Sequence, residues 1–74
     1  MCIQNRYHDF IEKAISEAKA SLDDVCLRAD DGAQVYAYPP NGPGRINWGV
    51  NRASDGVNIL RGVRLPNGKD TGVM

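Results

Sequence analysis

Hydrophobic positions in this chain follow two rhythms, and the change between them falls between Ser21 and Val25. Before the change, apolar residues recur at intervals of three and four, which lines one face of an α-helix. After it they alternate with polar residues, as strands do, between glycine-containing turns. The first rhythm predicts a helix over residues 4–22 whose apolar stripe is Ile3, Tyr7, Phe10, Ile11, Ala14, Ile15, Ala18 and Leu22.

The second rhythm predicts four strands, over residues 25–29, 34–38, 45–51 and 57–65. Because short connections join them, an antiparallel meander is expected, with the helix packed on one face of the sheet. The predicted fold is therefore α+β, in the order α-β-β-β-β. The side chains expected beneath the helix are Tyr36, Tyr38, Ile46, Trp48, Val57 and Ile59.

The connection between the first two strands decides which way the second strand faces. Asp31 and Gly32 suit the positive φ angles of a two-residue type I′ turn. That turn places Leu27 opposite Tyr36, with Tyr36 and Tyr38 on the helix side. A loop one residue longer would turn the second strand over, so the face of both tyrosines depends on this loop.

The remaining connections are rich in proline and glycine. Residues 39–44 hold three prolines and two glycines, which exclude regular structure. Gly62 is a candidate β-bulge in the fourth strand. The tail over residues 69–74 has little to bury and is expected to fray. No linker or repeat divides the chain, so residues 1–74 are expected to form one small domain.

Composition indicates a chain that folds. Its 74 residues are 42% hydrophobic and 24% charged, values that argue against disorder. No apolar run approaches the roughly 20 residues that cross a bilayer, and the first residues do not resemble a secretory signal. A cytoplasmic protein without membrane contact is expected. Cys2 and Cys26 are then expected to be reduced thiols rather than a disulfide.

Charge is balanced overall but unevenly distributed. Residues 1–31 hold seven acidic and four basic side chains, whereas residues 32–74 hold two acidic and five basic ones. This dipole can orient encounter with a charged partner, or it can reflect weak attraction between the helix and the sheet. A net charge of zero also favours self-association, so a homodimer is one alternative.

The chain offers no recognisable catalytic set. His8 is its one histidine, it lies on the polar side of the predicted helix, and no nucleophile accompanies it. Cys2, His8 and Cys26 lack the spacing of a zinc site, and the aspartates lack the ligand order of a calcium loop. No phosphate-binding glycine loop is present. We therefore expect no enzyme activity, no metal and no cofactor.

The sheet face away from the helix carries the candidate binding residues. It is expected to collect guanidinium and amide groups, and planar guanidinium groups suit bidentate pairing with carboxylate or phosphate. The alternative is that an uncovered antiparallel face is simply polar. The candidate residues, with Arg61 close by, are Arg28, Arg45, Asn47, Asn51, Arg52, Asn58 and Arg64.

Four aspartates form an alternative acidic contact for a basic partner: Asp23, Asp24, Asp30 and Asp31. The competing explanation is turn chemistry, because aspartate commonly ends helices and forms hairpin loops.

These observations favour a small non-enzymatic protein that acts stoichiometrically on a larger protein or ribonucleoprotein. Inhibitors and adaptors of phages and mobile elements, anti-CRISPR proteins among them, share this size and scarcity of motifs; the analogy is one of class. The alternative is a nucleic-acid-binding module that uses the arginine-rich sheet face. The neutral net charge argues against it, because such binders normally carry a basic excess.

Overall fold

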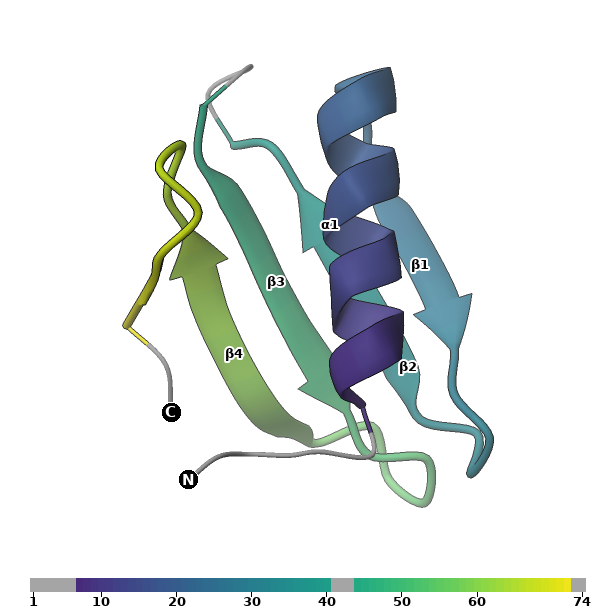
Figure 1. The fold of residues 1–74 in the computed structure, drawn as a ribbon. Coiled ribbons are helices and arrows are strands. Elements are labelled where there is room, and N and C mark those ends of the chain that lie inside the picture. Colours follow the sequence, from purple (N-terminus) through teal and green to yellow (C-terminus); the bar gives the residue numbers. More distant parts are fainter. Residues whose placement is uncertain (1–6, 41–43, 73–74) are drawn as a thin grey trace.

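The computed structural model describes residues 7–40 and 44–72, which form one helix packed against an antiparallel sheet (Figure 1). The elements are α1 (His8–Ser21), β1 (Val25–Arg28), β2 (Gln34–Tyr38), β3 (Ile46–Asn51), β4 (Asn58–Arg64) and β5 (Asp70–Thr71). Each strand pairs with its neighbour in the chain, in the order β1-β2-β3-β4-β5. The α+β prediction is confirmed, with five strands in place of four. The start of the predicted helix and residues 41–43 of the proline-glycine loop lie outside the described residues.

Helix α1 lies along one face of the sheet, mainly over β2, with β1 and β3 on either side (Figure 1). Its buried residues are Ile11, Ala14, Ile15 and Ala18, as the apolar spacing predicts. The helix ends because Leu22 adopts a left-handed conformation with φ of 55°, while its N–H donates to the carbonyl of Ala18 at 2.8 Å. Leu22 is 52% exposed, so its predicted place in the apolar stripe is wrong.

The hairpin between β1 and β2 has three loop residues, Asp30, Asp31 and Gly32. The N–H of Ala29 donates to the carbonyl of Ala33 at 2.8 Å, which closes the pair outside this loop. Gly32 supplies the positive φ, 89°, that such a loop needs at its last position. The carboxylate of Asp31 accepts the N–H of Ala33 at 2.9 Å and holds the turn. The predicted two-residue turn is therefore wrong by one residue.

This extra loop residue turns β2 over. Leu27 lies opposite Val35, and Cys26 lies opposite Tyr36. Because side chains alternate between the two faces of a strand, Tyr36 and Tyr38 point away from the helix rather than beneath it. The residues of β2 that lie beneath the helix are instead Val35 and Ala37. The buried residues are Ile11, Ala14, Ile15, Ala18, Ala29, Ala33, Val35, Ala37, Ile46, Trp48 and Val50.

An irregularity at the start of β4 removes two more residues from the predicted core. The pairing steps from Val50–Leu60 to Asn51–Asn58, so Ile59 is an extra residue without an opposite partner. Ile59 is 36% exposed and the preceding Val57 is 50% exposed, which contradicts the prediction that both lie beneath the helix. The bulge is thus at Ile59, whereas Gly62 pairs regularly opposite Trp48.

The segment after β4, expected to fray, returns to the sheet. A turn forms in which the N–H of Gly68 donates to the carbonyl of Leu65, and the N–H of Leu65 donates to the carbonyl of Lys69. Asp70 and Thr71 then pair with β4 as the short strand β5. Both residues of β5 are exposed, so this segment buries no apolar side chain, as the sequence predicts. It is ordered nevertheless, because backbone hydrogen bonds to β4 do not require buried side chains.

Truncation at a core position tests this assignment of faces. We expect Ile46→Ala to lower the free energy of unfolding by about 2–5 kcal/mol, because Ile46 is fully buried and the change leaves a cavity. The matched control is Ile59→Ala, which should change it by less than about 1 kcal/mol because the side chain lies at the exposed bulge. Urea denaturation followed by circular dichroism measures both; equal losses would contradict the bulge at Ile59.

Candidate functional site

One side of the sheet carries no element of the described chain, and we call it the open face. Its residues follow from the strand register, because partners across the sheet point to the same side. Three rows of partners cross it. The open-face residues of the strands are Cys26, Arg28, Gln34, Tyr36, Tyr38, Asn47, Gly49, Asn51, Asn58, Arg61, Val63 and Thr71.

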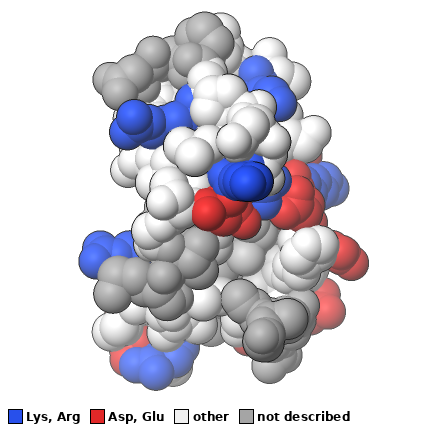
Figure 2. Space-filling view, turned by 60° about the vertical axis from the view of Figure 1, so that its left-hand side comes forward, with Lys and Arg blue, Asp and Glu red and all other residues white. Residues whose placement is uncertain are grey.

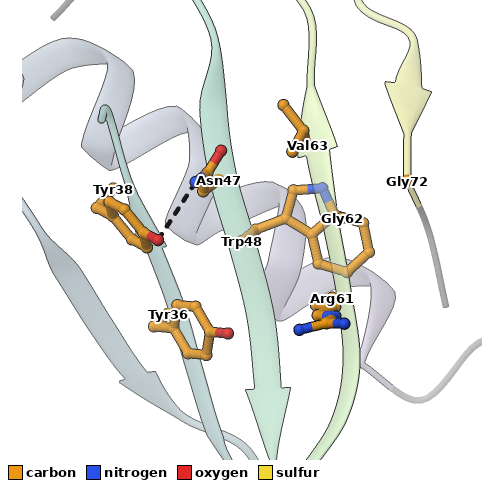
Figure 3. A pocket seen from close by; sticks show the side chains of 8 residues that line it. All are labelled: Tyr36, Tyr38, Asn47, Trp48, Arg61, Gly62, Val63 and Gly72. Carbon is orange, nitrogen blue, oxygen red and sulfur yellow. Dashed lines mark hydrogen bonds between the residues drawn. The ribbon is translucent and has the colours of Figure 1, made fainter. Parts of the chain in front are cut away.

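Two tyrosine rings occupy the middle of the open face. Tyr36 and Tyr38 have ring centroids 6.2 Å apart and ring planes inclined by 25°. Both rings lean from β2 toward β3 (Figure 3). The amide of Asn47 donates to the hydroxyl of Tyr38 at 3.2 Å, which holds one ring in place. A fixed aromatic surface therefore spans β2 and β3.

Glycine at position 49 is what allows the Tyr36 ring to lie down. Gly49 is the partner of Tyr36 across the sheet, and a Cβ atom at that position would stand 2.2 Å from the Tyr36 hydroxyl oxygen. Any larger residue would force the ring to move. The Tyr36 hydroxyl oxygen also lies 3.3 Å from the amide nitrogen of Asn58.

Asn58 links the bulge to the aromatic surface. Its amide group lies 2.9 Å from the carbonyl oxygen of Leu60 and 3.2 Å from that of Val50, the two carbonyls beside the irregular pairing. It also lies 3.2 Å from the side-chain oxygen of Asn51. Asn58 and Asn51, both predicted as binding residues, thus stabilise the sheet at this corner of the open face.

A shallow hollow of about 380 Å³ lies beside the tyrosines. Figure 3 shows Arg61 and Val63 on its β4 side, across β3 from the two rings. The side-chain oxygen of Asn47 is buried and has no hydrogen-bond partner among the described residues. The hollow is lined by Tyr36, Tyr38, Asn47, Trp48, Arg61, Gly62, Val63 and Gly72.

Arg28 and Arg61 supply the positive charge of the open face. Both are exposed, on β1 and β4 respectively. Arg28 donates to the carbonyl of Gly32 at 3.2 Å, which anchors it near the hairpin. Arg45, also exposed, precedes β3 and makes no hydrogen bond or ion pair within the described part of the chain.

Arg64 does not belong to this face, which corrects the prediction. It lies opposite Ile46 on the helix side, and only 18% of its side chain is exposed. Its guanidinium donates to both carboxylate oxygens of Glu12, at 3.0 and 2.6 Å, and also to the carboxylate of Asp70. The hydrogen bonds from Arg64 lower the pKa of Glu12, and both acids raise the pKa of Arg64. Arg64 therefore ties α1 to β4 and β5.

Arg52 also forms an ion pair within the protein, away from the strands of the open face. It lies in the turn after β3 and makes a two-point contact with Asp55, at 3.0 and 2.8 Å. This contact, together with the backbone N–H of Val57, lowers the pKa of Asp55 to about 2. Arg52 thus stabilises the turn between β3 and β4.

The four aspartates do not form one acidic surface. Asp23 and Asp24 precede β1, whereas Asp30 and Asp31 follow it, so the length of the strand separates them. Asp31 accepts the hydroxyl of Tyr7 at 2.6 Å in addition to its turn contact. For Asp31, the contacts therefore agree with turn formation rather than with an acidic surface for a partner.

Mixed charge marks the edge of the molecule near β4. Figure 2 shows basic and acidic side chains in contact near the centre of that side, with the other basic side chains in separate groups. A single continuous basic patch is absent from the described surface in this view. The strand residues of the open face, by contrast, include arginine but no aspartate or glutamate.

The remaining candidate groups are the histidine and the cysteines. His8 is exposed on α1, 3.4 Å from a carboxylate oxygen of Asp9. Among residues 7–40 and 44–72, no three side chains of the metal-binding types come together as a site. Cys26 is an exposed free thiol, while Cys2 lies outside these ranges. No helix in the described part is long and apolar enough to span a bilayer.

Comparison of the chain with protein-family models, with curated proteins and with solved structures finds no match. The functional argument therefore rests on the geometry of the open face.

The sequence placed Arg28, Asn47, Asn51 and Asn58 on the open face, as the structure does, and placed the tyrosines there only for the alternative of a longer hairpin loop, which is the loop observed. The signal that could have found them is the composition of the hairpin. Asp-Asp-Gly also suits a three-residue loop with glycine at its end, and that loop reverses β2.

Substitution at Gly49 tests the packing of the aromatic surface. We expect Gly49→Ala to displace the Tyr36 ring and to change the free energy of unfolding by no more than about 1 kcal/mol, because the ring is partly exposed and can turn aside. Nuclear Overhauser contacts between the Tyr36 ring and residue 49, present in the parent protein, should be lost. Gly56→Ala, where nothing lies within 4 Å of the added Cβ, is a control for the tyrosine contacts but not for stability, because the φ of 75° at Gly56 strains an alanine there. Unchanged contacts in Gly49→Ala would contradict this packing.

The ion pair on the helix side predicts a pH dependence of stability. Because the folded-state pKa of Glu12 is lowered, its contribution is present above the unfolded pKa and is lost as pH falls through the folded value. We expect Glu12→Gln to cost about 1 kcal/mol near pH 7 and almost nothing near pH 2.5, since the partly exposed pair is screened by solvent.

The control is Glu17→Gln on the same helix, where the carboxylate makes no ion pair within the described chain. Its effect on urea unfolding should be small at both pH values. A loss in Glu12→Gln that persists unchanged in acid would show that packing, rather than charge, is responsible.

Proposed function

We propose that this chain is a non-enzymatic binding protein that attaches stoichiometrically to a larger macromolecule in the cytoplasm through its open face. The observation that carries the proposal is the composition of that face. Tyrosine and arginine are enriched in binding interfaces, whereas lysine, glutamate and aspartate are depleted. The open face follows this pattern, with two tyrosines, two arginines and no lysine or carboxylate among its strand residues.

Rigidity supports the same function. The amide of Asn47 holds the hydroxyl of Tyr38, and Gly49 leaves space for the Tyr36 ring. A partner that covers these rings meets side chains already ordered, so little conformational entropy is lost on binding. A central aromatic anchor between arginines is also where binding energy concentrates in interfaces.

A protein that binds its partner without catalysing a reaction acts as an inhibitor or as an adaptor. A small domain that occupies a surface of its partner either blocks that surface or supplies a new one. Nucleic acid is the second candidate class, and the position of Tyr36 and Tyr38 on the open face favours it, because aromatic rings on a sheet can stack bases.

Differential capture from the native host tests the proposal. Tagged parent protein, Arg28→Glu and Tyr38→Ala are compared with Lys19→Glu, which makes the same charge change on exposed α1. We expect a specific partner to be enriched by the parent and by Lys19→Glu, and to be reduced at least about tenfold by both open-face variants. Quantitative mass spectrometry and nucleic-acid recovery provide the measurement.

Each capture is repeated after nuclease digestion, which separates a protein partner from one bound through nucleic acid. Circular dichroism confirms that all variants are folded. Capture that the open-face variants leave unchanged, whether or not nuclease is added, would refute the proposed use of this face.

A further inference from the structure

We propose that the partner of the open face is single-stranded nucleic acid, whose bases stack on the rings of Tyr36 and Tyr38. This inference rests on the proposed function and names the class of partner. Three features of the described residues carry it: the placement of the rings, the lack of aspartate and glutamate among the strand residues of the open face, and the positions of the two arginines.

The spacing of the rings suits unstacked bases. Their centroids are 6.2 Å apart with planes only 25° from parallel, side by side on one strand. Stacked bases in a duplex are separated by only about 3.4 Å, and their faces are covered by one another. A single strand can turn successive bases outward, so each meets an aromatic ring. The aromatic pair therefore selects a single strand over a duplex.

Charge around the rings is complementary to phosphate. Arg61 lies on β4, opposite Gly49, and Gly49 lies opposite Tyr36, so the guanidinium stands two strands from the ring. Arg28 lies on β1, on the other side of β2. The chain is neutral overall, but its acidic side chains belong to the helix, the turns and the helix side of β5. The strand residues of the open face thus offer two guanidinium groups to a phosphate backbone and include no aspartate or glutamate.

The other occupants fit less well. A second copy docked face to face would bring together two surfaces whose strand residues include arginine but no aspartate or glutamate, so the two faces are not complementary in charge. An acidic peptide would use the guanidinium groups but would place no planar group on the tyrosines. Nucleic acid alone uses rings and arginines together.

Fluorescence anisotropy provides the test, with fluorescein-labelled oligothymidylate and oligouridylate of about twelve nucleotides. We expect dissociation constants below about 100 μM at low salt, and weaker binding to a DNA duplex of the same length. Tyr36→Ala and Tyr38→Ala should each weaken binding roughly 5- to 150-fold through the loss of a stacking surface. Tyr36→Phe and Tyr38→Phe retain the rings and should change it by less than about threefold.

Salt provides a second, independent readout. If Arg28 and Arg61 each contact one phosphate, the logarithm of affinity should fall with the logarithm of salt at a slope of about −1.4. Arg28→Glu should make this slope shallower, whereas Lys19→Glu on α1 should leave it unchanged.

Three outcomes would overturn the inference: no binding to either oligonucleotide, equal losses in the Phe and Ala variants, or preference for a duplex. If oligonucleotides do not bind but nuclease-treated capture still depends on the open face, a protein partner is indicated and the proposed function stands. If mass doubles in light scattering and Tyr38→Ala restores the monomer, the face binds a second copy instead. If capture is also independent of the face, the proposed function fails as well.

Discussion

The number of residues between β1 and β2 determines what each face of this protein contains. With Asp30, Asp31 and Gly32 in the loop, the small side chains of β2 lie beneath the helix and both tyrosines lie on the opposite side. A two-residue loop would have required the helix to pack on two large rings with polar hydroxyls. Gly32 makes the longer loop possible because it adopts a positive φ without a Cβ clash.

A second constraint separates the charges of the molecule. Arg64 reaches Glu12 across 52 positions of sequence and also contacts Asp70, so one arginine fastens the helix, β4 and β5 together. These acids are thereby confined to the helix side of the sheet. The described strand residues of the open face then include two arginines and no aspartate or glutamate, although the chain as a whole has no net charge. A net charge of zero is therefore compatible with a sheet face whose charged strand residues are both arginines.

These two constraints lead to a rigid sheet face with an aromatic centre. The amide of Asn47 holds the hydroxyl of Tyr38, and Gly49 leaves space for the Tyr36 ring, which a Cβ atom at position 49 would displace. Such a face needs no catalytic groups to be functional, since its rings and guanidinium groups are suited to binding. The single-strand proposal follows from side-by-side rings, because these can receive separated bases but not the interior of a duplex.

The sequence by itself determined the helix, most of the strands and their meander order, because hydrophobic spacing and turn residues are local properties. It also identified several open-face residues, Arg28 and Asn47 among them. Only the tertiary structure decided the face of Tyr36 and the partners of Arg64. The first depends on a single loop residue, since strands alternate with a period of two. The second depends on how a helix crosses a distant strand, which no local pattern encodes.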